Sequence, residues 1–402
     1  MTNDLTSAGA KPTWDLAEFK RARWVVWLHF FMGGFLFAAW GIEIPNVKTH
    51  YGISEADLGL LLLGAGIGAL FALSMAGRVI ARWGASLVLS CTQASAALVM
   101  VFLFVFSSLP GLIGVLICFG FLGTLADVAI NAEAAELELR SQRTLMSTCH
   151  GMFSLGGMVG AGLGAGLLAL QMSAQWHLIC MAALIVLSVI VSYRMKPRDF
   201  GMMEQTIQTP LGRRHLLFPR AVLLLGMLAA LGFLAEGAMY DWSTLYMKQE
   251  LGSPVDQAAL AYAFFSAAMA ATRFIGDRLR ARYEPAALLR ACASLVVVAM
   301  VVMLLAGNPY VALVCFALAG VGLANVVPIL FSAAIKVPGI SAAQAIAAVS
   351  AVGYAGLMGG PALIGFVAHA STLTIALFLV AACALAQACL AKKALNPPRQ
   401  DP

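Results

Sequence analysis

The sequence has few charged residues: Asp, Glu, Lys and Arg make up 11% of its 402 residues, whereas soluble domains carry roughly 25%. Hydrophobic residues make up 61% of the chain, which is more apolar surface than a soluble domain of this length can bury. This composition excludes a soluble enzyme, a nucleic-acid-binding protein and a disordered chain. Since a membrane-spanning helix needs about 20 apolar residues, the chain has enough of them for about twelve spans.

Motifs for catalysis and for cofactor binding are also missing. The chain has 8 cysteines but no C-x-x-C pair, so neither a zinc site nor a disulfide framework is expected. It has no G-x-S-x-G elbow, no phosphate-binding G-x-x-x-x-G-K-[ST] loop and no His-rich metal box. We therefore expect no enzymatic activity, no cofactor and no metal. Because the sequence has no nucleotide-binding domain, we do not expect ATP to drive the protein directly, and an ion gradient is the remaining energy source.

Twelve apolar runs are long enough to span a membrane as helices. Their expected bounds are 23–44, 56–76, 86–107, 110–135, 144–169, 174–195, 219–243, 256–276, 285–306, 310–335, 342–367 and 371–391. Helices satisfy their own backbone hydrogen bonds in lipid, and these runs are too long and too continuous for barrel strands. The sequence therefore predicts an all-α integral membrane protein.

The basic residues predict the orientation of these spans. An N-terminus in the cytoplasm leaves only Lys48 and Lys248, of 25 Lys and Arg residues, on the opposite side. Because basic residues are retained in cytoplasmic loops, we predict a multi-pass protein of the bacterial inner membrane with both termini in the cytoplasm. The net charge of +6 then reflects topology, and no nucleic-acid partner is expected. The first twenty residues lack the apolar core of a signal peptide, so the first span is expected to be retained.

The chain repeats a pattern at an offset of 200 residues. The basic stretch 77–83 follows the second span and 277–283 follows the eighth, while Lys48 matches Lys248 in the preceding loops. Two parallel six-helix halves with a substrate site between them are a transporter architecture. The expected organisation is a cytoplasmic segment 1–22, an N-terminal half 23–195, a cytoplasmic linker 196–218, a C-terminal half 219–391 and a cytoplasmic tail 392–402.

These patterns resemble the major facilitator superfamily over essentially the whole chain. The loop after the second span is similar to the signature of that superfamily, which has Gly, then Asp-Arg, then further basic residues. The second copy keeps Gly276, Asp277 and Arg278, whereas the first copy has Gly77 where the acid usually stands. The resemblance implies a cytoplasmic latch, in which we expect Arg273 to pair with Asp277 one turn away. The latch set is Arg78, Arg82, Arg273, Asp277 and Arg278.

Four further stretches resemble the fucose-permease-like branch of bacterial transporters. They are 40–45, 127–131, 150–157 and 236–243. In the sugar–proton symporters of that branch, an acid on span four that lies four residues before an Asn is implicated in proton coupling. Asp127 and Asn131 match those two positions. Relatives commonly carry Arg at the position of Glu43, so their substrates are a poor guide here.

Ionisable residues inside the membrane are candidate functional sites, because a charge at the bilayer centre costs about 2.5–3.5 kcal/mol. Asp127 lies well inside span four, with Asn131 one turn away on the same face. A carboxyl group away from water favours its protonated form, which suits a proton carrier. His150 on span five lies at a comparable depth and could relay protons with Asp127. The alternative for both residues is a structural role in helix packing.

A second set of polar residues is expected to bind substrate or to gate the cavity. Glu43, Glu236 and Asp241 lie toward the outer ends of their spans, and acids at one mouth would favour cations or neutral polyols over anions. Asn325 on span ten matches Asp127 in the repeat, although a helix–helix hydrogen bond explains it equally well. Asp241 could instead be a solvated rim residue. The set is Asn131, Glu236, Tyr240, Asn325, Glu43 and Asp241.

The sequence thus predicts a secondary transporter that moves a small polar solute, such as a sugar, by alternating access. We expect proton-coupled symport by a monomer in the lipid bilayer. The alternative is a proton-driven efflux antiporter for drugs or metabolites, which the lack of proline at 158–160 in span five disfavours. A receptor or scaffold would need longer cytoplasmic domains than these loops provide.

Overall fold

The computed structural model describes residues 15–141, 143, 145–197, 200–201, 219–338, 340 and 342–395. Most of the expected linker, the first 14 residues and the tail from 396 lie outside the described residues. The N-terminal half contains α1 (Leu16–Tyr51), α2 (Glu55–Trp83), α3 (Ala85–Met100) with the 3-10 turn η1 (Val101–Phe104), α4 (Leu109–Ser141), α5 (Met146–Ala169) and α6 (Ala174–Met195). The C-terminal half contains α7 (Arg220–Gln249), α8 (Val255–Arg282), α9 (Pro285–Ala306), α10 (Pro309–Leu323), α11 (Val326–Ala334), α12 (Ala342–Ala370) and α13 (Leu373–Leu395).

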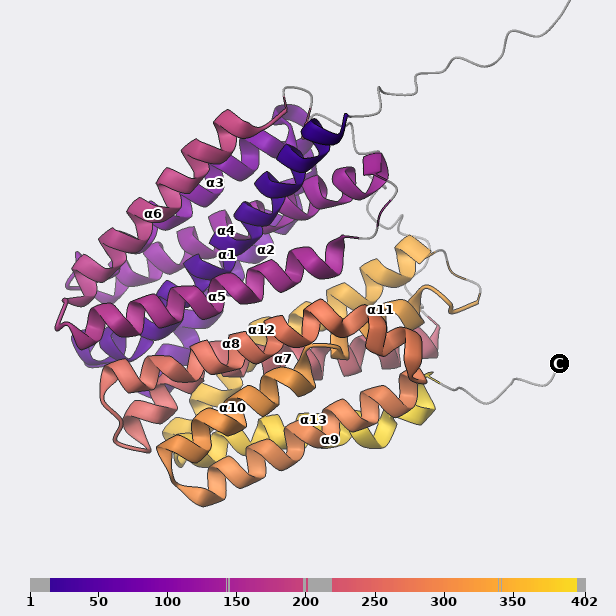
Figure 1. Cartoon of the computed structure of the whole chain (residues 1–402). Coiled ribbons are helices and arrows are strands. Elements are labelled where there is room, and N and C mark those ends of the chain that lie inside the picture. The colour runs from indigo at the N-terminus through magenta and orange to yellow at the C-terminus, as the bar shows by residue number, and fades with distance from the viewer. Residues whose placement is uncertain are drawn as a thin grey trace, which may run out of the picture.

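These helices confirm the predicted fold class. The described part of the chain has 12 helices that are long and apolar enough to cross a membrane, and it contains no β-strand. In Figure 1 they form two helical halves side by side, with α1–α6 above α7–α13. We call the end that carries Leu16 and Leu395 the terminal end, and the end that carries Tyr51 and Val255 the opposite end.

Local sequence signals explain where the first helices begin and end. Asp15 and Glu18 form a capping box at the start of α1, and Ser54 and Asp57 form another at the start of α2. These side chains satisfy backbone N–H groups that have no partner within the helix. Gly52 ends α1 with a φ of 62°, a conformation that favours glycine. The turn between the two helices is therefore encoded by only a few residues.

The predicted span 310–335 is interrupted in the structure. It divides into α10 and α11, with a turn at Ala324 and Asn325. Pro328 follows the turn, and a proline within a helix has no N–H to donate and clashes with the carbonyl group four residues earlier. That carbonyl belongs to Ala324. The break thus has a local cause in the sequence, and it places Asn325 at a helix end rather than on a continuous helix face.

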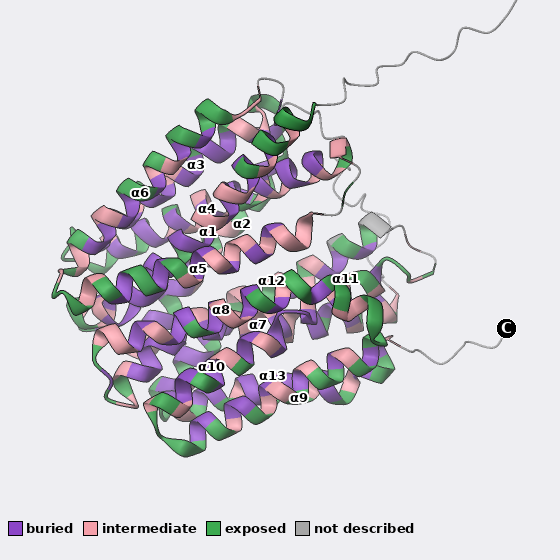
Figure 2. Cartoon of the chain, viewed as in Figure 1, coloured by how far each residue is buried: buried purple, intermediate pink, exposed green. Residues whose placement is uncertain are grey.

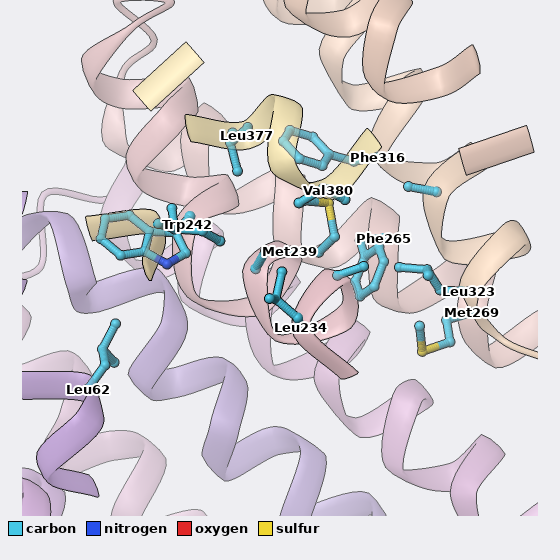
Figure 3. Packing of buried hydrophobic residues seen from close by; sticks show 14 of the residues in the cluster. Leu62, Leu234, Met239, Trp242, Phe265, Met269, Phe316, Leu323, Leu377 and Val380 are labelled. Carbon is cyan, nitrogen blue, oxygen red and sulfur yellow. The ribbon is translucent and has the colours of Figure 1, made fainter. Parts of the chain in front are cut away.

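Two long contacts join the halves. In them α5 packs along α8, and α2 packs along α12. Buried side chains of α7, α8, α10 and α13 form the core of the C-terminal half, as Figure 3 shows around Trp242, Phe265 and Phe316. Figure 2 shows that the exposed residues of the outer helices face away from the bundle. Many of these are large and apolar, including Leu60, Phe71 and Leu305, as expected of a surface that faces lipid.

Glycines allow α1 and α5 to approach closely. A Cβ atom on Gly34 would lie 1.8 Å from the carbonyl oxygen of Phe153, and one on Gly156 would lie 1.8 Å from that of Phe31. Since neither backbone can give way cheaply, both positions require glycine. On the same helix, Gly162 has no atom within 4 Å of an added Cβ.

We expect Gly156→Ala to lower the thermal unfolding temperature of the purified protein, because the new methyl group would force α1 and α5 apart. Overpacking of this kind typically costs about 1–3 kcal/mol. Gly162→Ala is the matched control and should leave the unfolding temperature unchanged or slightly higher, because alanine favours the helix. Equal unfolding temperatures for the two variants would contradict the close contact.

Candidate functional site

An ion pair lies where the two halves meet. The guanidinium of Arg273 on α8 donates from Nη2 to Glu236 Oε1 on α7 at 2.9 Å, and from Nη1 to Ser154 Oγ on α5 at 2.8 Å. The side chains of Arg273 and Glu236 are only 14% and 15% exposed. Ser147 on α5 also donates to the carbonyl oxygen of Arg273 at 3.2 Å. Arg273 therefore links an acid of its own half to a hydroxyl of the other half.

This arrangement corrects the expected pairing of Arg273 with Asp277. Asp277 pairs with Arg280 one turn along α8, and its side chain is 61% exposed. Arg273 lies on the face of α8 that packs against α5, where Glu236 and Ser154 offer partners away from solvent. The spacing of one turn did not predict the partner of Arg273, because it says nothing about the polar groups that neighbouring helices offer.

Asp127 lies on the inner side of α4 and is exposed despite its depth in the helix. Its described partner is the amide of Asn131, whose Nδ2 donates to the carboxylate at 3.2 Å and to the backbone carbonyl at 2.8 Å. Tyr354 of α12, in the other half, is within electrostatic reach of this carboxylate. The ring of Tyr354 stacks on Phe233 with centroids 5.7 Å apart. Asp127 therefore faces the C-terminal half, with an aromatic pair nearby.

The structure does not bring His150 and Asp127 together. The ring of His150 packs edge-on against Phe30 of α1, with centroids 5.3 Å apart, and its nearby charge is that of Arg273. Helix α5 makes its main contacts with α1 and α8 rather than with α4. A role for Asp127 or His150 in proton coupling stays a prediction, and a direct relay between them has no contact to support it.

Tyr240 and Asp241 lie one turn beyond Glu236 on α7. The ring of Tyr240 packs against Tyr262 and Phe265 of α8, with centroids 4.9 and 5.0 Å away, and its hydroxyl donates to Met269 Sδ at 3.5 Å. Asp241 is partly buried and within electrostatic reach of Tyr262. Both residues thus belong to the packed region between α7 and α8.

Glu43 has a partner that the sequence reasoning missed. Its Oε1 lies 2.7 Å from Nδ1 of His177 on α6, and both side chains are 0% exposed. The three outer acids are therefore not one cluster of equivalent charges, because Glu43 and Glu236 each have a separate buried partner. A histidine within the apolar run of span six was a signal that could have found His177, because such residues are rare in membranes.

Asn325 is buried at the break between α10 and α11 and is 1% exposed. Its Oδ1 lies close to α8, where a Cβ atom on Gly276 would be 2.7 Å away. Its Nδ2 has no described hydrogen-bond partner. Asn325 packs against α8, which favours the helix–helix alternative, and a role in substrate binding stays a prediction.

The remaining latch residues do not join the halves. Arg78 donates to the backbone carbonyl of Ser74, Arg82 lies over the ring of Trp83, and Arg278 is exposed. Among the described residues, each ion pair lies within one half. No ion pair between two described residues therefore joins the halves at the terminal end in this conformation.

Two acids at the terminal end of α4 are buried rather than solvated. Glu133 and Glu136 are 0% and 3% exposed. Glu133 pairs with Lys196, while Glu136 accepts from the backbone N–H of Gly201 at 2.9 Å. The start of the linker folds back onto α4 and supplies these partners, which a reading of α4 alone could not show.

The opposite ends of the halves are in contact. Gln249 at the end of α7 donates from Nε2 to Glu55 Oε1 at the start of α2, at 2.6 Å. A Cβ atom on Gly59 would lie 2.8 Å from the carbonyl oxygen of Pro361 on α12. This approach of the two backbones closes the bundle between α2 and α12 at the opposite end.

Comparison with known proteins identifies the family. The model of the Major Facilitator Superfamily matches residues 25–361. The chain is a member of this superfamily. It is 34% identical over 358 residues to an uncharacterised MFS-type transporter of Yersinia pestis, covering 88% of this chain and 91% of that protein. It is also 29% identical over 369 residues to the membrane protein MosC of Rhizobium meliloti, covering 90% of this chain and 87% of that protein.

Solved structures support the same fold. A variant of the nucleoside transporter NupG superposes with a TM-score of 0.75 at 14% identity, covering 94% of this chain and 100% of that chain. A D-xylose–proton symporter superposes with a TM-score of 0.75 at 14% identity, covering 95% and 99%. As a major facilitator, the protein is a membrane transporter of a small-molecule substrate and not an enzyme.

The Arg273–Glu236 pair can be tested by a double-mutant cycle. Breaking a buried ion pair costs about 3–5 kcal/mol, and the partial exposure of both side chains places Glu236→Gln and Arg273→Gln at the lower end of this range. The double variant should be more stable than the sum of the single effects predicts, because neither charge is then left unpaired. The measurement is thermal unfolding in detergent.

The pair of the exposed Asp277 with the partly exposed Arg280 is the control for this cycle. Exposed ion pairs contribute about 0–1 kcal/mol, so Asp277→Asn should shift the unfolding temperature little. A cycle at Arg273 and Glu236 with no coupling between the two changes would show that their contact does not stabilise the fold.

Proposed function

We propose that the protein is a proton-coupled secondary transporter that moves a small polar solute, such as a sugar, by alternating access as a symporter. The observation that supports this most directly is Asp127. It is an exposed carboxylate deep within a membrane-spanning helix, within electrostatic reach of Tyr354 in the other half. Its described partner is the amide of Asn131 rather than a cation.

The absence of a described cation partner makes Asp127 suitable for proton binding. A carboxyl group takes up and releases one proton, and a fixed positive charge beside it would oppose the uptake. Glu236 differs in this respect, because Arg273 lies 2.9 Å from it. We therefore assign the proton to Asp127 and assign substrate binding or gating to the region around Glu236 and Tyr240.

Alternating access requires contacts that can form and break at each end. In this conformation α2 and α12 meet at the opposite end, while no described ion pair joins the halves at the terminal end. With the terminal end in the cytoplasm, as the basic residues predict, the molecule is closed to the outside. Arg273 and Ser154 lie between α5 and α8, the surfaces that we expect to rock against each other.

Asp127→Asn tests the proton assignment in sealed vesicles. We expect the variant to lose solute accumulation driven by a pH gradient, because the amide cannot carry a proton, while solute exchange at equal concentrations survives. Asp277→Asn is the control and should retain accumulation, because Asp277 is exposed and pairs within α8. Undiminished accumulation in Asp127→Asn would exclude Asp127 as the proton carrier.

A thermal-shift screen of the purified protein can identify the solute. Sugars, polyols, nucleosides, organic acids and organic cations are the probes. A ligand that binds only the folded protein raises its unfolding temperature with concentration. We expect a neutral polar ligand to stabilise the wild type and to lose this effect in Glu236→Gln but not in Asp277→Asn. Stabilisation by organic anions alone would contradict the proposed solute class.

The direction of transport has a separate test in cells. A deletion strain that fails to grow on one carbon source indicates uptake, as proposed. Sensitivity of that strain to toxic compounds, with normal growth on every carbon source, would favour efflux instead.

A further inference from the structure

A buried carboxylate and imidazole pair lies at the opposite end of the N-terminal half. Glu43 Oε1 on α1 is 2.7 Å from His177 Nδ1 on α6, and Asn46 donates from Nδ2 to Glu43 Oε2 at 2.7 Å. The other ring nitrogen of His177, Nε2, is buried and has no described hydrogen-bond partner. The pair thus leaves one polar atom in the protein interior without a hydrogen bond. Such an atom lowers the stability of the fold, so its presence calls for an explanation.

Nε2 of His177 can bind a proton, and the space around it leaves no room for a larger ligand. A neutral imidazole that donates Nδ1–H to a carboxylate keeps a free lone pair on Nε2. A Cβ atom on Gly164 of α5 would lie 2.9 Å from this nitrogen, so the surrounding space is too small for a larger ligand. Uptake of one proton changes the net charge of the pair from −1 to 0, whichever of the two residues holds it.

A cation of the other half lies within electrostatic reach of the pair. Lys248 on α7 interacts electrostatically with Glu43 and with Lys48. Lys48 is itself paired with Glu55 at 3.1 Å, and Glu55 accepts from Gln249 across the interface. Lys248 is therefore a cation of the C-terminal half that is attracted to Glu43. This attraction depends on the net charge of Glu43 and His177.

The other elements around the pair contribute less charge. Helix α5 has no charged or titratable side chain beyond Cys149 and His150, which lie at its other end. From the C-terminal half, the ring of Tyr262 approaches within 2.6 Å of where a Cβ on Gly41 would lie. Asp241 on α7 is within electrostatic reach of Tyr262. Gly41 lies two residues before Glu43, so the pair is adjacent to a point where the halves touch.

We propose that Glu43 and His177 form a proton-binding site that controls the contact between the two halves at the opposite end. With no proton bound, the negative pair attracts Lys248 and holds the ends together. Proton uptake removes this attraction, which is strong where water is excluded, and favours separation of the ends. This inference rests on the proposed alternating access, and it adds a second proton site distinct from Asp127.

The test measures the separation of the opposite ends at two pH values. Spin labels are attached to cysteines at Ser107 and Ala306, both exposed in loops or helix ends of different halves, in a background without the native cysteines. Distances are compared at about pH 8.5 and about pH 5.5, on either side of the range in which an imidazole usually titrates. The wild type should gain a longer distance at the lower pH, with its population rising about fivefold.

Two variants remove the effect by different routes. Glu43→Gln keeps the shape of the side chain but has no charge, so it should show the longer distance equally at both pH values. Lys248→Gln removes the cation and should give the same result with the pair intact. If Glu43→Gln does not fold, Lys248→Gln alone decides the outcome.

His50→Gln is the matched control. His50 lies at the same end of α1 but is exposed and packs against Tyr51 and Phe104, so this variant should respond to pH as the wild type does. The proposal is overturned if Glu43→Gln or Lys248→Gln retains the response, or if His50→Gln abolishes it. Asp127→Asn separates the two proton sites, because it should keep the distance change while losing proton-driven accumulation.

Discussion

A charge placed inside a membrane protein needs a partner, and the positions of these partners decide how the two halves hold together. Arg273 forms an ion pair with Glu236 in its own half and donates a hydrogen bond to Ser154 in the other half. The resulting link lies in the contact of α5 with α8, where the proposed alternating access requires the halves to move. A hydroxyl can exchange its hydrogen bond for one with water at little cost, whereas the ion pair with Glu236 cannot. The link is therefore strong within the C-terminal half and easily broken between the halves.

The same constraint explains why the ionisable residues divide into different groups. Glu43, Glu133 and Glu236 each have a basic partner and little or no exposure. Asp127 is the contrasting case, since its described partner is an amide and its side chain is exposed. Exposure at that depth requires a water-accessible space between the halves rather than lipid. An acid with these properties can change its charge without leaving a buried cation unpaired.

Much of the fold could be predicted from the sequence, whereas most of the side-chain contacts could not. The length of each apolar run fixes the spans, because the bilayer thickness sets the length of a helix, and Pro328 marks the break near Asn325. Partner choice depends on helix packing, which spacing along one helix does not contain. Asp277 was thus expected to pair with Arg273, whereas Arg273 contacts Glu236 and Ser154 on other helices and Asp277 pairs with Arg280. The pairing of Glu43 with His177 joins residues 134 positions apart and has no local signal.

The repeat gives the two halves the same helices but not the same chemistry. The repeat expected from the sequence matches Asn325 of α10–α11 with Asp127 of α4, and the structure gives the two residues different surroundings. Asp127 is exposed to the interface, while Asn325 is buried against α8 at a proline-induced break. The N-terminal half carries the groups that we propose to bind protons, Asp127 and the Glu43–His177 pair. The C-terminal half presents Lys248, a cation within electrostatic reach of Glu43. A change in protonation of one half alters its attraction to the other, which is the physical requirement for coupling protons to the movement of the halves.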